Sequence, residues 1–184
     1  MAETVLELDD LTVRFSLRRG DLTAVDGVSF SIERGQTFGL VGESGSGKSV
    51  TAKAIMRLIP DPPGEIPRGR VLFEGSNILD KSDAEMRALR GRRIAMVFQE
   101  PMSALNPVFT VCDQISDALR TNLGLSKVEA RERVIELLSL VGIPSPQKRV
   151  DSYVHEFSGG MRQRVMIAMA LSCNPSFLIA DEPT

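Results

Sequence analysis

A glycine-rich run at residues 42–49 constrains this chain more than any other feature. It lies between an apolar stretch at residues 37–41 and a helical pattern at residues 48–59. Its members fit the spacing GxxxxGK[ST]: Gly42, Glu43, Ser44, Gly45, Ser46, Gly47, Lys48 and Ser49. Glycines allow positive φ, so successive N–H groups can line one concave surface, to which the following helix adds its positive end. With Lys48 as a cation for phosphate and Ser49 as a hydroxyl for Mg²⁺, we expect a phosphate-binding loop.

Composition limits the class of protein that carries this loop. The 184 residues suffice for one domain with a sizeable core, and the net charge of −2 gives no bulk attraction to nucleic acid, so no nucleic-acid partner is expected. Cys112 and Cys173 have neither CxxC spacing nor a nearby histidine, and we expect buried, reduced thiols. The start of the chain lacks a signal-like apolar run, and residues 165–171 are too few to span a membrane. We expect an intracellular protein that reaches a membrane through a partner.

Hydrophobic periodicity predicts the order of strands and helices. Two antiparallel strands are expected at residues 5–15 and 22–32. A strand buried on both faces, typical of a parallel sheet, is expected at residues 37–41. Further buried strands are expected at residues 94–98 and 177–180, and a short strand at 71–73. Helices are expected at residues 48–59, 82–89, 111–121, 126–141 and 159–171. This order predicts an α/β fold of the P-loop NTPase class, with a parallel core sheet, an N-terminal antiparallel β-subdomain and an inserted α-helical subdomain.

Two carboxylates follow the last predicted strand. Asp181 and Glu182 come directly after residues 177–180, and the carboxyl ends of parallel strands are where ligands of open α/β sheets bind. Asp181 can hold Mg²⁺ there, and Glu182 can orient an attacking water. Alone, the pair would be read as a solvated strand end. Together with the loop at residues 42–49, it predicts a nucleotide site.

A second helix start with anion-binding geometry follows the helical insert. Ser158, Gly159 and Gly160 precede the apolar pattern of the predicted helix at residues 159–171, and a helix N-terminus attracts anions. Taken alone, this tripeptide is a flexible helix cap. Two phosphate-binding helix starts in one chain require either two ligands or one ligand shared between two chains.

These motifs together resemble the ATP-binding subunits of ABC transporters. Residues 42–49 match the Walker A loop, Gln99 the Q-loop, residues 158–160 the signature, and residues 177–182 the Walker B strand. The resemblance implies that Phe15 stacks on adenine, although an aromatic residue in a strand is also a common core residue.

The resemblance also implies the chemistry and the assembly of the site. Glu182, Gln99 and Lys48 would support ATP hydrolysis, and Ser49, Gln99 and Asp181 would hold Mg²⁺. Two ATP-binding subunits, identical or homologous, would pair head to tail, so that Ser158 and Gly160 of one contact the ATP held by the other.

Longer segments of the sequence are similar to those of the oligopeptide and dipeptide importer branch of this family, which also contains nickel systems. FQEPMSALNPVFTV and HEFSGGMRQRVMIAMAL carry this similarity, including Phe157 and Met161 in place of the commoner Leu and Gln. It implies a permease docked on residues 99–108, from Gln99 to Val108, an indirect role for a solute-binding protein, and a peripheral position on the cytoplasmic face of the bacterial inner membrane. Two alternatives stay open: a non-transport ABC ATPase of DNA repair or translation, and a nucleotide-binding fragment without hydrolysis.

We expect the chain to be one incomplete ATP-binding domain, residues 1–184. Within it we predict a β-subdomain and nucleotide-binding core at 1–110, a helical subdomain at 111–157, and the signature helix with the Walker B strand at 158–184. The chain stops at Thr184, directly after a strand, and the resemblance places a γ-phosphate-contacting histidine later than that. His155, the single histidine, precedes the signature and is expected to be structural. The fragment is therefore not expected to complete hydrolysis alone.

Overall fold

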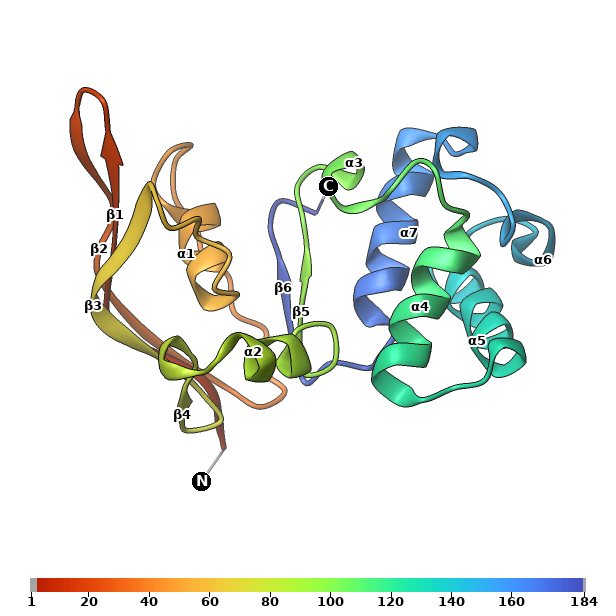
Figure 1. Ribbon diagram of the computed structural model, residues 1–184, viewed down its shortest axis with the longest axis horizontal. Coiled ribbons are helices and arrows are strands. Elements are labelled where there is room, and N and C mark those ends of the chain that lie inside the picture. Colours follow the sequence, from red (N-terminus) through yellow and green to blue (C-terminus); the bar gives the residue numbers. More distant parts are fainter. Residues whose placement is uncertain (1–2, 184) are drawn as a thin grey trace. The chain divides into compact units, whose positions relative to one another are not determined.

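The computed structural model describes residues 3–183 and divides into two compact units, Met1–Met86 and Arg87–Thr184. The first unit is a sheet with short helical segments, and the second contains several helices and a parallel strand pair (Figure 1). The three-part division predicted from sequence, with boundaries after residues 110 and 157, stays a prediction. Its last residue, Thr184, lies outside the described residues.

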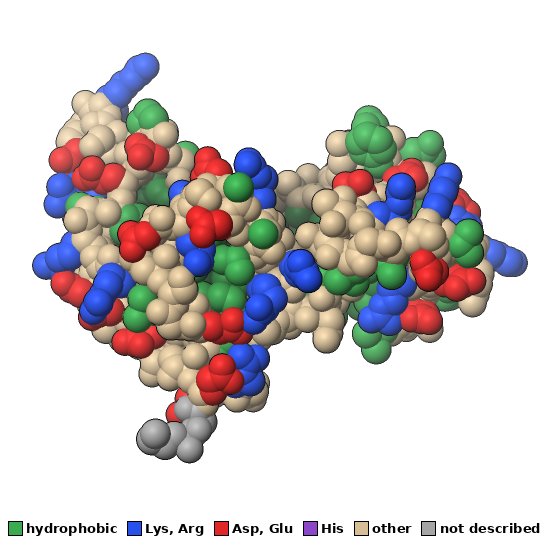
Figure 2. All heavy atoms as spheres, turned by 60° about the horizontal axis from the view of Figure 1, so that its bottom comes forward, with side chains coloured by type: hydrophobic (Ala, Val, Ile, Leu, Met, Phe, Trp, Pro, Cys, Tyr) green, Lys and Arg blue, Asp and Glu red, His purple; other side chains and the backbone are tan. Residues whose placement is uncertain are grey.

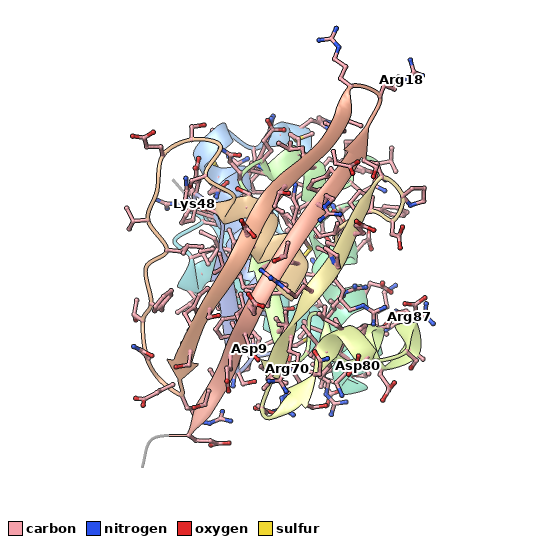
Figure 3. All side chains as sticks on the ribbon, turned by 90° about the vertical axis from the view of Figure 1, so that its left-hand side faces the viewer. Asp9, Arg18, Lys48, Arg70, Asp80 and Arg87 are labelled. Atoms are coloured by element: carbon pink, nitrogen blue, oxygen red, sulfur yellow. The ribbon has the colours of Figure 1, made fainter. Side chains whose placement is uncertain are left out.

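The first unit is built on an antiparallel sheet with strand order β2-β1-β3-β4. Its strands are β1 (Thr4–Leu17), β2 (Gly20–Glu33), β3 (Gly64–Phe73) and β4 (Ser76–Asn77). The predicted β1–β2 hairpin is confirmed, whereas β3 begins at Gly64 rather than at residue 71. Asp9 and Arg70 face each other across β1 and β3 with a 2.6 Å ion pair (Figure 3). Such cross-strand pairs help to set the register of a sheet.

Helix α1 (Lys48–Ile55) is shorter than the helix predicted at residues 48–59. Arg57 has a φ of 48°, which takes the chain out of the right-handed helical region before Pro60 is reached. Proline therefore does not end this helix. The residues after Ile55 instead lead toward the start of β3.

The strand predicted at residues 37–41 is wrong. The structure assigns no strand there, and Phe38, Leu40 and Val41 are 40%, 43% and 93% exposed. A strand is defined by hydrogen bonds to a neighbour, and the described residues provide no strand alongside this segment. Phe38 stacks on Phe30 of β2, with 4.9 Å between the ring centroids. The apolar run is therefore neither paired as a strand nor buried on both faces.

The second unit combines a strand pair with helices. The strands β5 (Ile94–Val97) and β6 (Phe177–Ala180) pair in parallel. The helices of this unit are α3 (Pro101–Ala104), α4 (Val111–Leu123), α5 (Lys127–Leu140), α6 (Pro146–Arg149) and α7 (Gly159–Leu171). The 3-10 helix η2 (Val154–Glu156) precedes α7. The bounds predicted for α7 and β6 are those observed.

Local hydrogen bonds explain where several helices begin. Ser82, before α2 (Asp83–Leu89), and Ser126, before α5, both form the predicted reciprocal bonds with the glutamate three residues later. Thr110 forms a further capping box at the start of α4. Each cap satisfies backbone N–H groups that have no partner within the helix.

The core of the second unit lies among α4, α5 and α7. Ile115, Leu119, Val134 and Leu138 are all fully buried. Cys112 and Cys173 are buried free thiols, as predicted. β5 is buried throughout, but Leu178 of β6 is 40% exposed, so the prediction of a buried strand at residues 177–180 is wrong as to burial. Among the described residues β6 has a single strand partner, which leaves part of its surface uncovered.

The surface carries charges of both signs. Figure 2 shows Lys and Arg side chains interspersed with Asp and Glu over the face that it presents. Within the described part of the chain, no helix combines the length and the apolar character needed to cross a membrane.

Arg131 of α5 binds Asp151 through two 2.6 Å hydrogen bonds. These bonds stabilise the charged carboxylate and hold the pKa of Asp151 below its usual range. The pair connects α5 to the segment after α6. Because the two side chains are 42% and 61% exposed, solvent screening keeps its contribution to stability small.

We expect Asp151→Asn to lower the midpoint of thermal unfolding at neutral pH and to lose this effect in acid. A carboxyl whose pKa is lowered on folding adds stability above its unfolded pKa of about 3.9, and this stability is lost as the pH falls through the lower folded pKa. The difference between wild type and variant should therefore shrink from pH ~6 to pH ~3, as followed by circular dichroism. Arg131→Gln should behave alike, and a difference that stays constant with pH would contradict this assignment.

Candidate functional site

The loop at residues 42–47 is held against the sheet by a close approach of backbone. Gly45 and Gly47 have φ values of 82° and 92°, a backbone region that residues other than glycine rarely adopt. A Cβ added to Gly47 would overlap the carbonyl oxygen of Ala24 on β2. Gly47 also immediately precedes α1. The glycine is therefore required both by its conformation and by the contact that joins the loop to β2.

Lys48 extends its cation across the start of this loop. Its Nζ donates to the carbonyl oxygens of Gly42 and Glu43 at 2.9 and 3.0 Å. Lys48 is the first residue of α1, Ser49 follows it, and Figure 3 shows Lys48 beside the β2 edge of the sheet. A cation, a hydroxyl and a helix N-terminus thus lie together, an arrangement that favours the binding of phosphate.

Parallel pairing brings two predicted residues together in the second unit. Val97 of β5 pairs with Ala180 of β6, and the N–H of Asp181 extends the ladder by donating to the Val97 carbonyl at 3.0 Å. Beyond this edge, Gln99 Nε2 donates to Glu182 Oε2 at 2.7 Å. The sequence predicts roles for Gln99 and Glu182 but not their contact, because the two residues are far apart in the chain.

The predicted signature forms the N-terminus of α7. Ser158 is its N-cap, and its Oγ accepts a hydrogen bond from the N–H of Met161 at 3.4 Å. A Cβ added to Gly159 or Gly160 would meet nothing within 4 Å, so this helix start is open. On the same helix, Gln163 Nε2 donates to the Pro183 carbonyl at 3.0 Å. The helix that begins at the signature is thus connected to the segment that follows Glu182.

Phe157, which precedes the signature, is buried in the core of the second unit. Its side chain is 2% exposed, and the guanidinium carbon of Arg149 lies 5.6 Å from its ring centroid. A cation over an aromatic face is attracted by the ring quadrupole. The aromatic residue that replaces the commoner leucine therefore anchors the approach to α7 from inside the unit.

His155 lies on η2 and is exposed. Its ring stacks on that of Tyr153 with 5.6 Å between centroids, and its backbone oxygen accepts from Arg162 at 3.3 Å. The expectation that this histidine is structural stays a prediction.

Phe15 lies near the hairpin end of β1. It is half-buried, opposite Leu22 of β2 on one side and opposite Gly64 of β3 on the other. Part of its ring is therefore accessible, and its role toward a base stays a prediction.

Permease docking was predicted on residues 99–108, but the cavity that lies next to this segment was not predicted. Met102, Val108 and Phe109 are 46%, 71% and 50% exposed. A cavity of about 740 Å³ begins at Phe109 and continues between α4 and α5, with charged residues of both signs in its lining. The sequence carried one signal for this cavity: Asp113 and Asp117 stand four residues apart on α4 and so share a face.

The predicted site residues form two groups, one in each unit. Phe15 and residues 42–49 belong to the first unit. Gln99, Asp181, Glu182 and residues 158–160 belong to the second. The sequence profile of the ABC transporter family matches residues 25–184, which include all of these except Phe15. This chain belongs to the ABC transporter family.

Two transport ATP-binding proteins of the family are similar in sequence to nearly the whole of this chain. It is 54% identical over 180 residues to the oligopeptide transport ATP-binding protein OppD of Bacillus subtilis, covering 98% of this chain and 50% of OppD. It is 52% identical over 182 residues to the dipeptide transport ATP-binding protein DppD of the same organism, covering 99% of this chain and 54% of DppD. The chain thus spans about half the length of these curated relatives.

A solved structure shows the same fold. The ATP-binding cassette MJ0796, in a dimeric post-hydrolysis state bound to ADP and Pi, superposes with a TM-score of 0.86 at 28% identity. The match covers 97% of this chain and 74% of that one. The expected fold class, with its antiparallel β-subdomain and helical part, is confirmed.

We expect Gly47→Ala to destabilise the protein more than Gly45→Ala. Both glycines have positive φ, which costs a non-glycine residue about 1 kcal/mol or more. Only at Gly47 would the added methyl group also overlap the backbone of Ala24, whereas at Gly45 it meets nothing within 4 Å. Urea denaturation of both variants measures the two losses in free energy of unfolding. Equal losses would show that the contact with β2 does not constrain the loop.

Proposed function

We propose that this chain is the nucleotide-binding part of an ATPase subunit that powers import of peptides, or of a related small solute, through a membrane permease. The observation that carries the proposal is the 2.7 Å hydrogen bond from Gln99 to Glu182 at the carboxyl edge of β5 and β6. It joins the residue proposed to orient water with the first residue of the segment proposed to bind the permease. The names of the relatives, which are peptide transport ATP-binding proteins, support the choice of solute.

ATP and Mg²⁺ are the proposed cofactors. Residues 42–49 would hold the phosphates, with Lys48 placed against the β- and γ-phosphates. The hydroxyl of Ser49, the amide oxygen of Gln99 and the carboxylate of Asp181 are hard oxygen donors, which suit Mg²⁺. Gln99 donates to Glu182 through its Nε2, and the bond to Glu182 does not involve its Oε1. When bound, Mg²⁺ would neutralise charge on the phosphates.

Glu182 is the proposed catalytic carboxylate. Its position two residues after β6 and its bond from Gln99 fix where the carboxylate lies within the second unit. A carboxylate held in this way can accept a hydrogen bond from an attacking water and orient it. Because the amide of Gln99 donates to one carboxylate oxygen, movement of the segment after Gln99 would alter that orientation.

The open start of α7 supports a shared site between two subunits. Gly159 and Gly160 leave space above the helix N-terminus, where a phosphate of the partner subunit's ATP would be bound. MJ0796, the structural relative, is dimeric. We propose a head-to-tail pair with a second ATP-binding subunit, identical or homologous.

The surface at residues 99–108 supports docking of a permease. Val108 and Phe109 expose apolar area beside the cavity between α4 and α5, and exposed apolar side chains beside a hollow mark protein interaction sites. Gln99 begins the same segment. We propose that this surface binds a permease on the cytoplasmic side of the membrane, that the subunit is peripheral there, and that a solute-binding protein acts through the permease.

The alternatives lead to different results. A non-transport ATPase of DNA repair or translation would purify without a permease, while a nucleotide-binding fragment would bind ATP without turnover. The transport names of the relatives favour the first proposal over a non-transport ATPase, and measured turnover separates it from the fragment.

In the full-length subunit, we expect Glu182→Gln to retain ATP binding but to hydrolyse ATP about 100-fold more slowly or slower still. The variant should therefore accumulate as an ATP-bound dimer. Lys48→Ala is the matched variant and should lose ATP binding itself, because the cation for the phosphates is gone. Calorimetry with ATP, phosphate release and light scattering measure the three properties. Unchanged turnover in Glu182→Gln would remove the proposed catalytic role, and tight binding by Lys48→Ala would remove the role of the loop.

We expect Val108→Asp to weaken association with the permease about tenfold or more, since it places a charge in an apolar contact. Val128→Asp is the control: Val128 is 67% exposed in the first turn of α5, where aspartate is well tolerated. Co-purification of the full-length subunit with its permease measures the effect. Equal recovery of the permease with both variants would place the docking surface elsewhere.

A further inference from the structure

Gly64, the first residue of β3, lies beside the ring of Phe15. A Cβ added to Gly64 would stand 2.8 Å from Phe15 Cε1 and 2.5 Å from Ile59 Cγ2, closer than packed carbon atoms approach. Gly64 is buried, and it is not among the residues with positive φ. Its backbone conformation therefore does not call for glycine. The space taken by the Phe15 ring, by Ile59 and by the Pro60 carbonyl oxygen, 3.0 Å from such a Cβ, does.

The ring belongs to a row of three cross-strand neighbours. Phe15 pairs with Leu22 of β2 and with Gly64 of β3, and directly opposite residues of antiparallel strands share one face. Leu22 is 53% exposed, Phe15 half-buried and Gly64 buried. The ring therefore leans toward the glycine, and the part of it that is not covered faces solvent.

Backbone hydrogen bonds hold this arrangement on both sides of the glycine. The N–H of Gly64 donates to the Pro60 carbonyl at 2.8 Å, and the N–H of Ser16, next to Phe15, donates to the Pro63 carbonyl at 2.9 Å. The segment from Pro60 to Gly64 follows α1, which begins at the phosphate-binding loop. Since the loop also contacts β2 at Ala24, the ring and the loop are positioned by the same sheet.

We infer that Gly64 is a positioning residue for the purine base of the bound nucleotide. The absence of a side chain at Gly64 leaves the space into which the Phe15 ring leans, and this sets the orientation of the surface on which the base stacks. The inference rests on the proposed stacking role of Phe15. It assigns Gly64 to recognition of the base and not to recognition of the phosphates, which are bound at residues 42–49.

The test compares two triphosphate ligands, one with a nucleoside and one without. In the full-length subunit with Mg²⁺, calorimetry measures binding of ATP and of inorganic tripolyphosphate, which lacks both base and ribose. Phe15→Ala should weaken ATP binding about tenfold, because base–aromatic stacking is lost, and leave tripolyphosphate binding unchanged. Gly64→Ala should weaken ATP binding in the same ligand-selective way, by about threefold to tenfold. The double variant should bind ATP no more weakly than Phe15→Ala alone, since both changes act through one ring.

Two further variants separate this role from a general loss of structure. Gly75→Ala, just beyond the other end of β3, introduces a side chain at positive φ where a Cβ meets nothing within 4 Å, and it should leave ATP binding unchanged. If Gly64→Ala does not fold, Ile59→Ala combined with Gly64→Ala removes the overlap with Ile59 and keeps the one with Phe15. This double variant should still show the ATP-selective loss.

The outcomes distinguish the two proposals. If Phe15→Ala leaves the preference for ATP over tripolyphosphate unchanged, the stacking role of Phe15 fails and the role of Gly64 fails with it. If Phe15→Ala removes the preference but Gly64→Ala does not, the stacking role stands and the inference about Gly64 is wrong. If Gly64→Ala weakens both ligands alike, or weakens ATP binding further in the Phe15→Ala background, Gly64 does not act through the ring and the inference is likewise wrong.

Discussion

Parallel pairing of β5 with β6 is the constraint on which the second unit depends. Ile94 to Val97 pair with Phe177 to Ala180 in register, although more than half of the unit's residues lie between them. Because both strands end at the same edge, the segments that follow them must leave together, and the hydrogen bond from Gln99 to Glu182 is the result. The buried faces of α4, α5 and α7 form the core into which the side chains of Ala95 and Val97 pack.

In the first unit the corresponding constraint is a pair of glycines that allow close approach. Gly47 brings the phosphate-binding loop against β2, and Gly64 lets the Phe15 ring lie over β3. Both contacts exclude a side chain, one because backbone meets backbone and the other because a ring fills the space. The sheet thus positions the loop proposed to bind phosphate, which contacts β2, and the Phe15 ring on β1, and these two strands are hydrogen-bonded to one another. This arrangement suits a ligand with a charged end and a flat apolar end.

Sequence reasoning was most accurate where short-range interactions decide the structure. The bounds of α7 and β6 were predicted to the residue, and the capping boxes at Ser82 and Ser126 mark true helix starts. It failed at residues 37–41, at the end of α1 and in the burial of β6. An apolar run shows that a segment can form a buried strand, but burial also needs neighbours on each side. Likewise the left-handed conformation of Arg57, not the visible Pro60, ended α1.

The sequence by itself determined the types of chemistry and their local setting: a glycine loop before a helix, a helix start at Ser158, and two carboxylates after a strand. These features depend on residues a few positions apart, so spacing and backbone preference are enough to recognise them. Only the tertiary structure decided that Gln99 contacts Glu182 and that Phe15 lies over Gly64. Both contacts join residues that are distant in the chain, and their existence depends on strand register, which the packing of whole elements sets and no local pattern encodes.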